Sequence, residues 1–86
     1  MQTDEVKAPP HTVEIHVNNR PVTVPRPRIT GLEIKQAAVA QGVPIHADFV
    51  LSEELPHHKT KIIGDTDVIT VTKESRFVAV APDDNS

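Results

Sequence analysis

Apolar and polar residues alternate strictly from residue 12 to residue 17, with valine or isoleucine at every odd position. This period of two predicts a strand with one buried face. Asn18 and Asn19 follow directly, and the pair favours a tight turn because asparagine tolerates positive φ. The β-branched residues 22–24 come next. We therefore expect a hairpin at the start of the folded part of the chain.

Three prolines shape the end of this hairpin and the segment that crosses from it. Pro21 and Pro25 bracket the second strand. Because proline has no N–H to donate, that strand should lie at the edge of its sheet. Pro25 and Pro27 should also hold the crossing segment extended as far as residue 30.

The strongest local signal in the sequence is the start of a helix after this crossing. Thr30 can accept a hydrogen bond from the amide of Glu33, and Glu33 can reach back to the amide of Thr30, the reciprocal pairing of a capping box. The helix should begin at Gly31. It should stop at Gly42, since glycine readily takes the left-handed conformation that ends helices.

The predicted helix carries two stripes. The face expected to pack on a sheet has three-or-four spacing and consists of Ile34, Ala37, Ala38 and Gln41. Leu32 and Val39 lie seven positions apart and make a second stripe, which one small sheet would not fully cover. We expect a partner surface on this flank or on the exposed face of the sheet. In the alternative, both side chains pack under the loop of residues 42–48.

Short apolar runs alternate with turn-forming segments after the helix. Strands are expected in the apolar runs, at residues 49–51, 61–63, 68–72 and 76–81. Loops or turns are expected in the polar segments, at residues 52–59, 64–67 and 73–75. The centre of the last run lacks polar alternation, as in a strand that is buried mid-sheet or covered on both faces.

This order of elements predicts an α+β fold, a β-grasp in which a mixed β-sheet packs on one α-helix. The last strand can run parallel to the first because the helix lies on the long connection between them. One core should be formed by Val13, Ile15, Val17, Ile34, Ala38, Phe49 or Leu51, Ile69, Val71 and residues of the last strand. A shift of one residue in the fifth strand would replace Ile69 and Val71 by Val68 and Thr70.

Composition excludes several classes of function. The 86 residues include no cysteine, which excludes disulfides, cysteine-based metal sites and thiol nucleophiles. The net charge is −3, and Phe49 and Phe77 are the two aromatic residues, so neither a basic patch nor a stacking platform for nucleic acid is expected. No apolar run has the length of a membrane span. We expect one small cytoplasmic domain without nucleic-acid or membrane partners.

Four pieces of the sequence carry a resemblance to a known family. They read HVNNRPVTV, RITGLEI, IIGDTDVITV and RFVAVAP. Together with the order of elements, they resemble the bacterial multi-ubiquitin domain family, small ubiquitin-like proteins that occur in single or tandem copies. The resemblance runs from about Thr12 to Pro82. Its best markers are the RITG entry to the helix and Arg76-Phe77 at the opening of the last strand.

The resemblance implies a ubiquitin-like protein modifier that takes part in antiphage defence. Its implied partners are bacterial relatives of ubiquitin-activating and ubiquitin-conjugating enzymes, a deconjugating peptidase and an unknown target protein. The modifier would be activated and conjugated through its C-terminal segment. That segment consists of Pro82, Asp83, Asp84, Asn85 and Ser86. Its polar composition after a proline predicts mobility in the free protein.

Two other functions need different features. A non-conjugated β-grasp interaction module needs only a surface. A sulfur carrier needs a C-terminal glycine pair, whereas this chain ends in Asn85-Ser86. The expected organisation is a disordered leader at residues 1–10, a β-grasp domain at residues 11–82 and a flexible tail at residues 83–86.

The sequence predicts no catalytic, cofactor-binding or metal-binding residues, and we do not expect an enzyme. His57 and His58 are adjacent, which would point them to opposite faces of a strand, and the sequence places no third ligand beside them. We interpret them as solvated loop histidines. No serine stands in a glycine-framed turn of the kind that presents a nucleophile.

Overall fold

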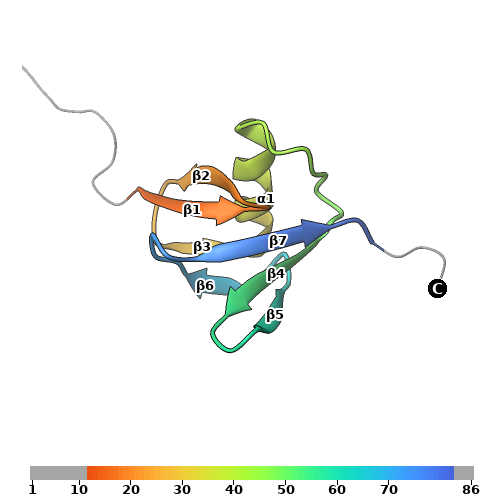
Figure 1. The fold of residues 1–86 in the computed structure, drawn as a ribbon. Helices are drawn as coiled ribbons and strands as arrows, with labels where there is room; N and C mark the ends of the chain where they lie inside the picture. Colours follow the sequence, from red (N-terminus) through yellow and green to blue (C-terminus); the bar gives the residue numbers. More distant parts are fainter. Residues whose placement is uncertain (1–11, 83–86) are drawn as a thin grey trace, which may run out of the picture.

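The computed structural model describes residues 12–82. The leader and the tail expected at residues 1–10 and 83–86 lie outside the described residues. Within them, one helix is accompanied by strands before and after it (Figure 1). The elements are β1 (Val13–Val17), β2 (Arg20–Val24), β3 (Arg28–Thr30), α1 (Gly31–Ala40), β4 (Val50–Leu55), β5 (Lys59–Ile63), β6 (Val68–Thr70) and β7 (Arg76–Val80).

Five strands form one sheet in the order β2-β1-β7-β4-β5, and β3 pairs with β6 in a separate antiparallel ribbon. β7 runs parallel to β1 and antiparallel to β4, so the sheet is mixed. The helix packs on one face of this sheet, behind β1 and β7 in the view of Figure 1. This is the ubiquitin-like β-grasp arrangement, as the sequence predicted.

The first hairpin confirms its prediction in detail. Asn18 and Asn19 have φ of 52° and 66° and form the turn between β1 and β2. β2 lies at an edge of the five-stranded sheet, as its prolines predicted. The register places Pro21 opposite His16.

The helix begins at Gly31 behind the expected capping box. Thr30 Oγ1 accepts a hydrogen bond from the Glu33 amide at 3.2 Å, and Glu33 Oε1 accepts one from the Thr30 amide at 3.0 Å. The last helical residue is Ala40, and Gly42 follows with a φ of +95°. The stop signal at this glycine is therefore confirmed.

The buried face of the helix differs in part from the prediction. Ile34 and Ala38 are fully buried, as expected, while Ala37 is half-buried. Gln41 is exposed, so its assignment to the packing face is wrong; its carboxamide instead bonds the backbone of β2. Lys35 is also buried, although a charged residue was not expected on the packing face.

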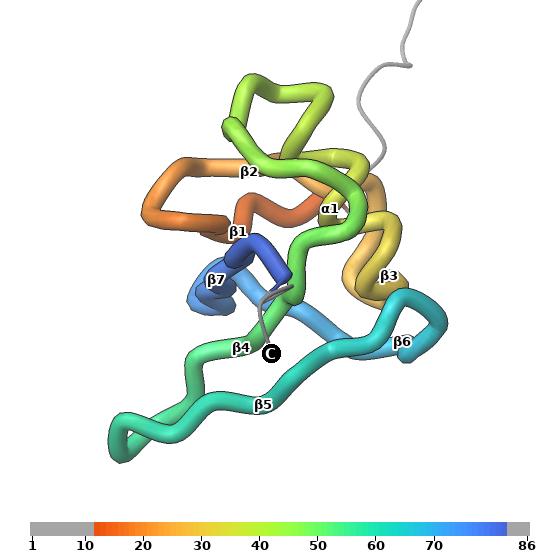
Figure 2. The backbone as a smooth tube through the Cα atoms, turned by 90° about the vertical axis from the view of Figure 1, so that its right-hand side faces the viewer, coloured from red at the N-terminus to blue at the C-terminus, as the bar shows by residue number. Residues whose placement is uncertain are grey.

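The predicted loop at residues 52–59 is wrong. β4 continues to Leu55, and β5 begins at Lys59, so the two strands make a hairpin closed by residues 56–58. Figure 2 shows this hairpin projecting from the body of the domain. Acidic residues suggested a loop because they are rare in buried strands, but the part of β4 after Leu51 is only half-buried, with Glu54 exposed, and accommodates them.

Three further differences concern the short strands. β3 was not expected, because the prolines before it suggested only an extended crossing. β6 ends at Thr70, although the expected strand ran to residue 72. β7 lies inside the sheet as predicted, but one of its faces is exposed, and Val80 retains 52% of its accessible surface.

One core joins the sheet, the helix and the ribbon. Of the predicted core residues, Ile15, Val17, Ile34, Ala38, Leu51 and Val71 are buried, and Val13, Phe49 and Ile69 are partly buried against them. Val68 and Thr70 are exposed, so the alternative register considered for the strand expected at residues 68–72, now β6, is excluded. The last strand contributes Phe77 and Ala79. The core also contains Val22, Val24, Ile29, Val43, Ile45 and Ile63.

Candidate functional site

The end of β7 is fixed by a side chain from the first hairpin. The carboxamide of Asn18 donates to the carbonyl of Ala79 at 3.1 Å and accepts from its amide at 2.9 Å. The backbone amide of Asn18 also donates to the Phe77 carbonyl at 2.9 Å. Asn18 therefore extends the parallel pairing of β1 and β7 beyond the last residue of β1.

The chain leaves the sheet directly after this anchor. Ala81 and Pro82 follow β7, and both are exposed. Of the predicted C-terminal segment, Pro82 is the last residue that the structure describes. Asp83, Asp84, Asn85 and Ser86 lie outside the described residues.

An apolar surface borders this exit on the face of the sheet opposite the helix. In the antiparallel register Val50 faces Val80, and Ser52 faces both Val78 and Ile62. Directly opposed residues share a face, and so do alternate residues of one strand. We call Val50, Ile62, Val78 and Val80 the sheet patch; Ile62 and Val80 are 68% and 52% exposed, and the two others are half-buried.

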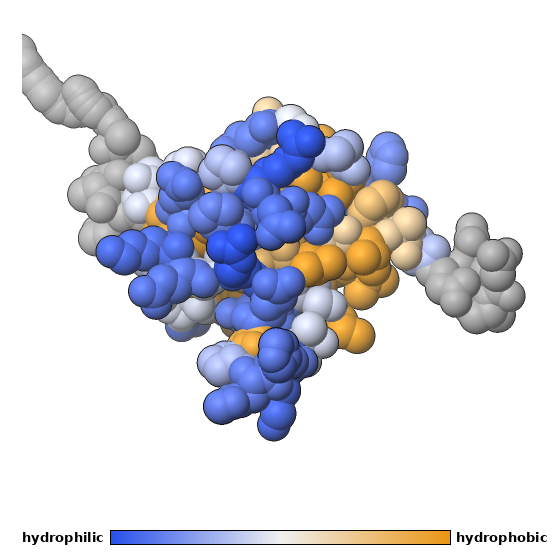
Figure 3. All heavy atoms as spheres, viewed as in Figure 1, coloured by the Kyte–Doolittle hydropathy of each residue, from blue (hydrophilic) through white to orange (hydrophobic). Residues whose placement is uncertain are grey.

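Figure 3 shows this face of the molecule. Apolar surface gathers over the end of β7 and the adjacent strand, next to the point where the chain leaves. Polar side chains cover most of the neighbouring surface. The sheet patch is thus an apolar area with a polar rim, which is typical of interaction surfaces.

The helix flank that the sequence singled out is less uniform than expected. Val39 is 47% exposed, whereas Leu32 is half-buried. A shallow hollow of about 290 Å³ lies between the helix and the loop before β4. Its lining includes Val39 and three residues of that loop, Ile45, His46 and Ala47, but not Leu32. The structure therefore does not bring Leu32 and Val39 into one site.

A buried lysine anchors the same loop to the helix. Lys35 Nζ donates to the carbonyls of Ala47 and Phe49 at 2.6 and 2.9 Å and lies 2.7 Å from a carboxylate oxygen of Asp65. The lysine side chain is 5% exposed, and that of Asp65 is 52% exposed. Three partners satisfy the ammonium group, so we interpret Lys35 as structural.

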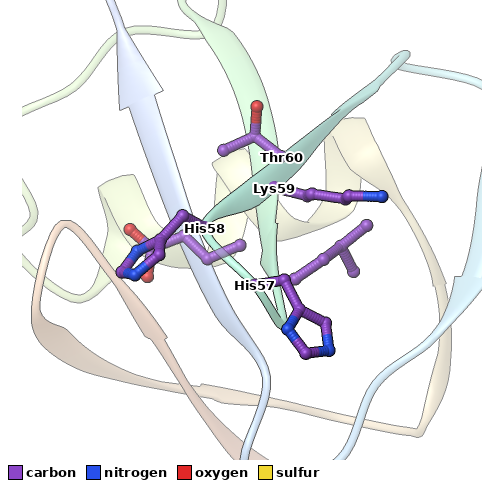
Figure 4. Close-up of a pocket in the computed structure, with 6 residues that line it drawn as sticks. His57, His58, Lys59 and Thr60 are labelled. Atoms are coloured by element: carbon purple, nitrogen blue, oxygen red, sulfur yellow. The ribbon is translucent and has the colours of Figure 1, made fainter.

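The second hollow lies at the tip of the projecting β4–β5 hairpin. It measures about 510 Å³ and is lined by residues from both arms, including Glu54, Leu55 and Thr60. His57 and His58 both have positive φ, 66° and 61°, and their rings point away from one another (Figure 4). Among the described residues no group of three potential ligands could hold a metal ion. The two imidazoles are exposed turn residues, in agreement with the sequence-based interpretation.

The described part of the chain contains no helix that is long and apolar enough to cross a membrane. Within residues 12–82, one ionisable group has a clearly shifted pKa. The Thr30 backbone amide and the Arg26 guanidinium both bond the Glu33 carboxylate and lower its pKa. This shift belongs to the capping box and marks no reactive group.

Comparison with known proteins identifies the family. The model of one family, described as Multiubiquitin, matches residues 13–83. The chain belongs to the multiubiquitin family. No curated protein and no solved structure gives a significant match. The family match covers every strand and the helix of this multiubiquitin domain.

Sequence reasoning had named the exposed sheet face of this multiubiquitin domain without its residues. The sheet patch was hidden because Val50 stood in one predicted strand, Ile62 in another, and Ser52 in a predicted loop. Only the register of β4 with β5 and β7 brings these positions together. A signal was present in the unbroken apolar run of β7, which supplies two of the four patch residues.

Proposed function

We propose that this multiubiquitin domain is a protein modifier joined to its targets through the segment that follows β7. The observation that carries the proposal is the family match together with the point at which the chain leaves β7. β7 is held between β1 and β4, and the chain leaves it beside the sheet patch. An enzyme bound to the patch would therefore be close to the segment that it must process.

Conjugation through a carboxyl end requires activation first. The carboxylate attacks the α-phosphate of ATP, forming an acyl-adenylate and releasing pyrophosphate. A thiol of the activating enzyme displaces AMP to give a thioester, and an amine or hydroxyl of the target then displaces the thiol. The domain contributes recognition and the carboxylate, while relatives of ubiquitin-activating and ubiquitin-conjugating enzymes perform the chemistry. A peptidase would hydrolyse the bond between the modifier and its target. The whole pathway would act in the cytoplasm, in defence against phage.

The composition of the terminal segment leaves two forms of this proposal. Residues 82–86 contain one proline and no glycine, unlike the glycine pair of ubiquitin. Either the cognate activating enzyme accepts this acidic sequence, or a peptidase trims it before activation. Ala81 and Pro82 are both exposed, so the last described residues after β7 are accessible to an enzyme cleft.

The test is an activation assay with a ubiquitin-activating-like enzyme encoded in the same genome, taken from beside this chain where one is found. The purified domain is mixed with ATP and that enzyme, and mass spectrometry is used to detect an adenylate, ester or thioester. If the full-length chain gives a product, deletion of residues 83–86 should abolish it, with an almost unchanged melting temperature. If the full-length chain gives none, forms ending at each of residues 82–85 test for prior trimming.

A non-conjugated interaction module is the second candidate, and the absence of glycine from residues 82–86 favours it. In that case all terminal forms would be inert in the activation assay. The intact domain would still bind the activating enzyme or another protein partner through its surface. A sulfur carrier would require a terminal glycine able to form a thiocarboxylate.

A further inference from the structure

The two edge strands of the five-stranded sheet, β2 and β5, differ in whether their outward-facing backbone groups are already bonded. On β2, Thr23 donates its amide to Gln41 Oε1 at 2.8 Å, and its carbonyl accepts from Gln41 Nε2 at 2.7 Å. The outward-facing backbone groups of Thr23 are therefore already bonded. Pro21 and Pro25 lie two residues on either side and point their nitrogens the same way, but they have no N–H. This edge cannot accept another strand without breaking the Gln41 bonds.

The opposite edge is open. β5 pairs with β4 on one side, and no strand of the five-stranded sheet pairs with its other side. Residues 59–62 are exposed, and β5 contains no proline. Every second residue of such an edge strand presents its N–H and C=O outward, ready to pair with an extended peptide.

The side chains of β5 indicate which peptide would fit. Lys59 and Lys61 share one face of the strand, and Thr60 and Ile62 share the other. No carboxylate within residues 12–82 lies at ion-pair distance from either lysine. Ile62 belongs to the sheet patch, so the second face continues an apolar surface. An added strand would place acidic residues beside the lysines and apolar residues beside Thr60 and Ile62.

A second copy of β5 does not meet these requirements. In an antiparallel pair centred on Lys61, the two Lys61 side chains would stand directly opposite each other, which is unfavourable. Edge lysines are a common means of preventing such self-pairing. The same lysines select for an acidic partner strand.

We propose that the β5 edge binds an extended peptide of a partner protein in which acidic and apolar residues alternate. The peptide adds a sixth strand next to β5 and pairs its acidic side chains with Lys59 and Lys61. This interaction is non-covalent and goes beyond the proposed modifier function. It stands whether or not the segment after β7 is conjugated.

The direct test uses a synthetic peptide, EVEVEVE with blocked ends, and the full-length isotope-labelled protein. We expect chemical-shift changes concentrated in residues 59–63 and slower hydrogen exchange of alternate β5 amides on binding. A composition-matched peptide, EEEEVVV, should bind more weakly because its charges cannot alternate along a strand. Equal effects of both peptides, or shifts confined to β2, would overturn the proposal.

Charge reversal supplies the matched control. The double variant K59E/K61E should lower the affinity for EVEVEVE by about tenfold or more, since like charges across a binding surface repel. The same variant should gain affinity for KVKVKVK. K73E changes an exposed turn lysine by the same chemistry and should retain binding. Unchanged binding by K59E/K61E would refute strand addition at β5. So would NMR resonances of β5 that broaden with rising protein concentration in the absence of peptide, because the edge would then pair with a second copy of the chain.

Discussion

The ammonium group of Lys35, buried on the helix, lies 2.7 Å from the half-exposed carboxylate of Asp65 in the turn before β6. The same ammonium bonds two carbonyls of the loop between the helix and β4. One side chain therefore fixes three segments that are distant in sequence. Its burial is tolerated because each of its donors has a partner.

Replacement of Lys35 by methionine should destabilise the domain by about 1–3 kcal/mol, because the Ala47 and Phe49 carbonyls lose their donor. Urea unfolding measures this change. Asp65→Asn should cost less than about 1 kcal/mol, since the carboxylate is half-exposed and screened by water. Lys73→Met is the control at an exposed turn. Equal stability of Lys35→Met and the control would contradict the anchoring role.

The core assignment predicts large losses at two positions. Ile15→Ala and Ile34→Ala should each cost about 2–5 kcal/mol, because both side chains are fully buried and leave a cavity. Ile62→Ala, on the exposed sheet face, should change the free energy of unfolding by less than about 0.5 kcal/mol. If either buried variant melted like its parent, the core would be wrongly assigned.

Gly31 should not tolerate a methyl group. A Cβ built at this position would clash with the backbone carbonyl oxygen of Gly64. Gly31→Ala should therefore destabilise the domain by about 1–3 kcal/mol, although alanine is the better helix former. Gln36→Ala, at an exposed helix position, isolates the propensity effect and should be neutral or slightly stabilising. A stabilised Gly31→Ala variant would show that the contact with Gly64 can relax at no cost.

The capping box predicts a pH dependence. The pKa of Glu33 is lowered in the folded state, so its carboxylate stabilises the fold above the ordinary pKa of 4.5 and less so as the pH falls. The parent should exceed Glu33→Gln in stability at neutral pH because only the carboxylate attracts Arg26. This difference should disappear in acid, where both side chains are neutral. A difference that persisted there would have a cause other than ionisation.

The position of the partner surface can be tested by a pair of substitutions. Val80→Glu places a charge in the sheet patch, and Val39→Glu places one on the helix flank. If the sheet patch recognises the activating enzyme, Val80→Glu should reduce enzyme-induced chemical shifts and adenylate formation several-fold, while Val39→Glu should retain both. The reverse pattern would assign recognition to the helix flank. Because both valines are exposed, both variants should fold.

The sequence predicted those elements whose signals are local. The alternation before Asn18 and the pairing of Thr30 with Glu33 each involve only neighbouring residues of the sequence, and both were confirmed. The β4–β5 hairpin was missed because its acidic residues contradict strand propensity, and only its exposure resolves the conflict. The burial of Lys35 was also unpredictable, since it depends on carbonyls and a carboxylate brought together by the tertiary fold.

The same reasoning applies to the candidate surfaces. Val39 was identified from helical spacing, which a sequence carries directly. The sheet patch required the register of three strands, and a pattern along one strand cannot supply it. The edge position of β2 was predicted from Pro21 and Pro25. The hydrogen bonds between Gln41 and Thr23 that block this edge could not be predicted, because they depend on how the helix docks on the sheet.

The parallel pairing of β1 and β7 also determines how the domain responds to force. The chain enters at the start of β1 and leaves at the end of β7, on opposite sides of the molecule in Figure 1. A pull on these two ends slides the strands past each other and loads their hydrogen bonds together, in shear, instead of opening them one at a time. A motor that pulls on the chain beyond β7 would have to overcome this resistance before it unfolds the domain.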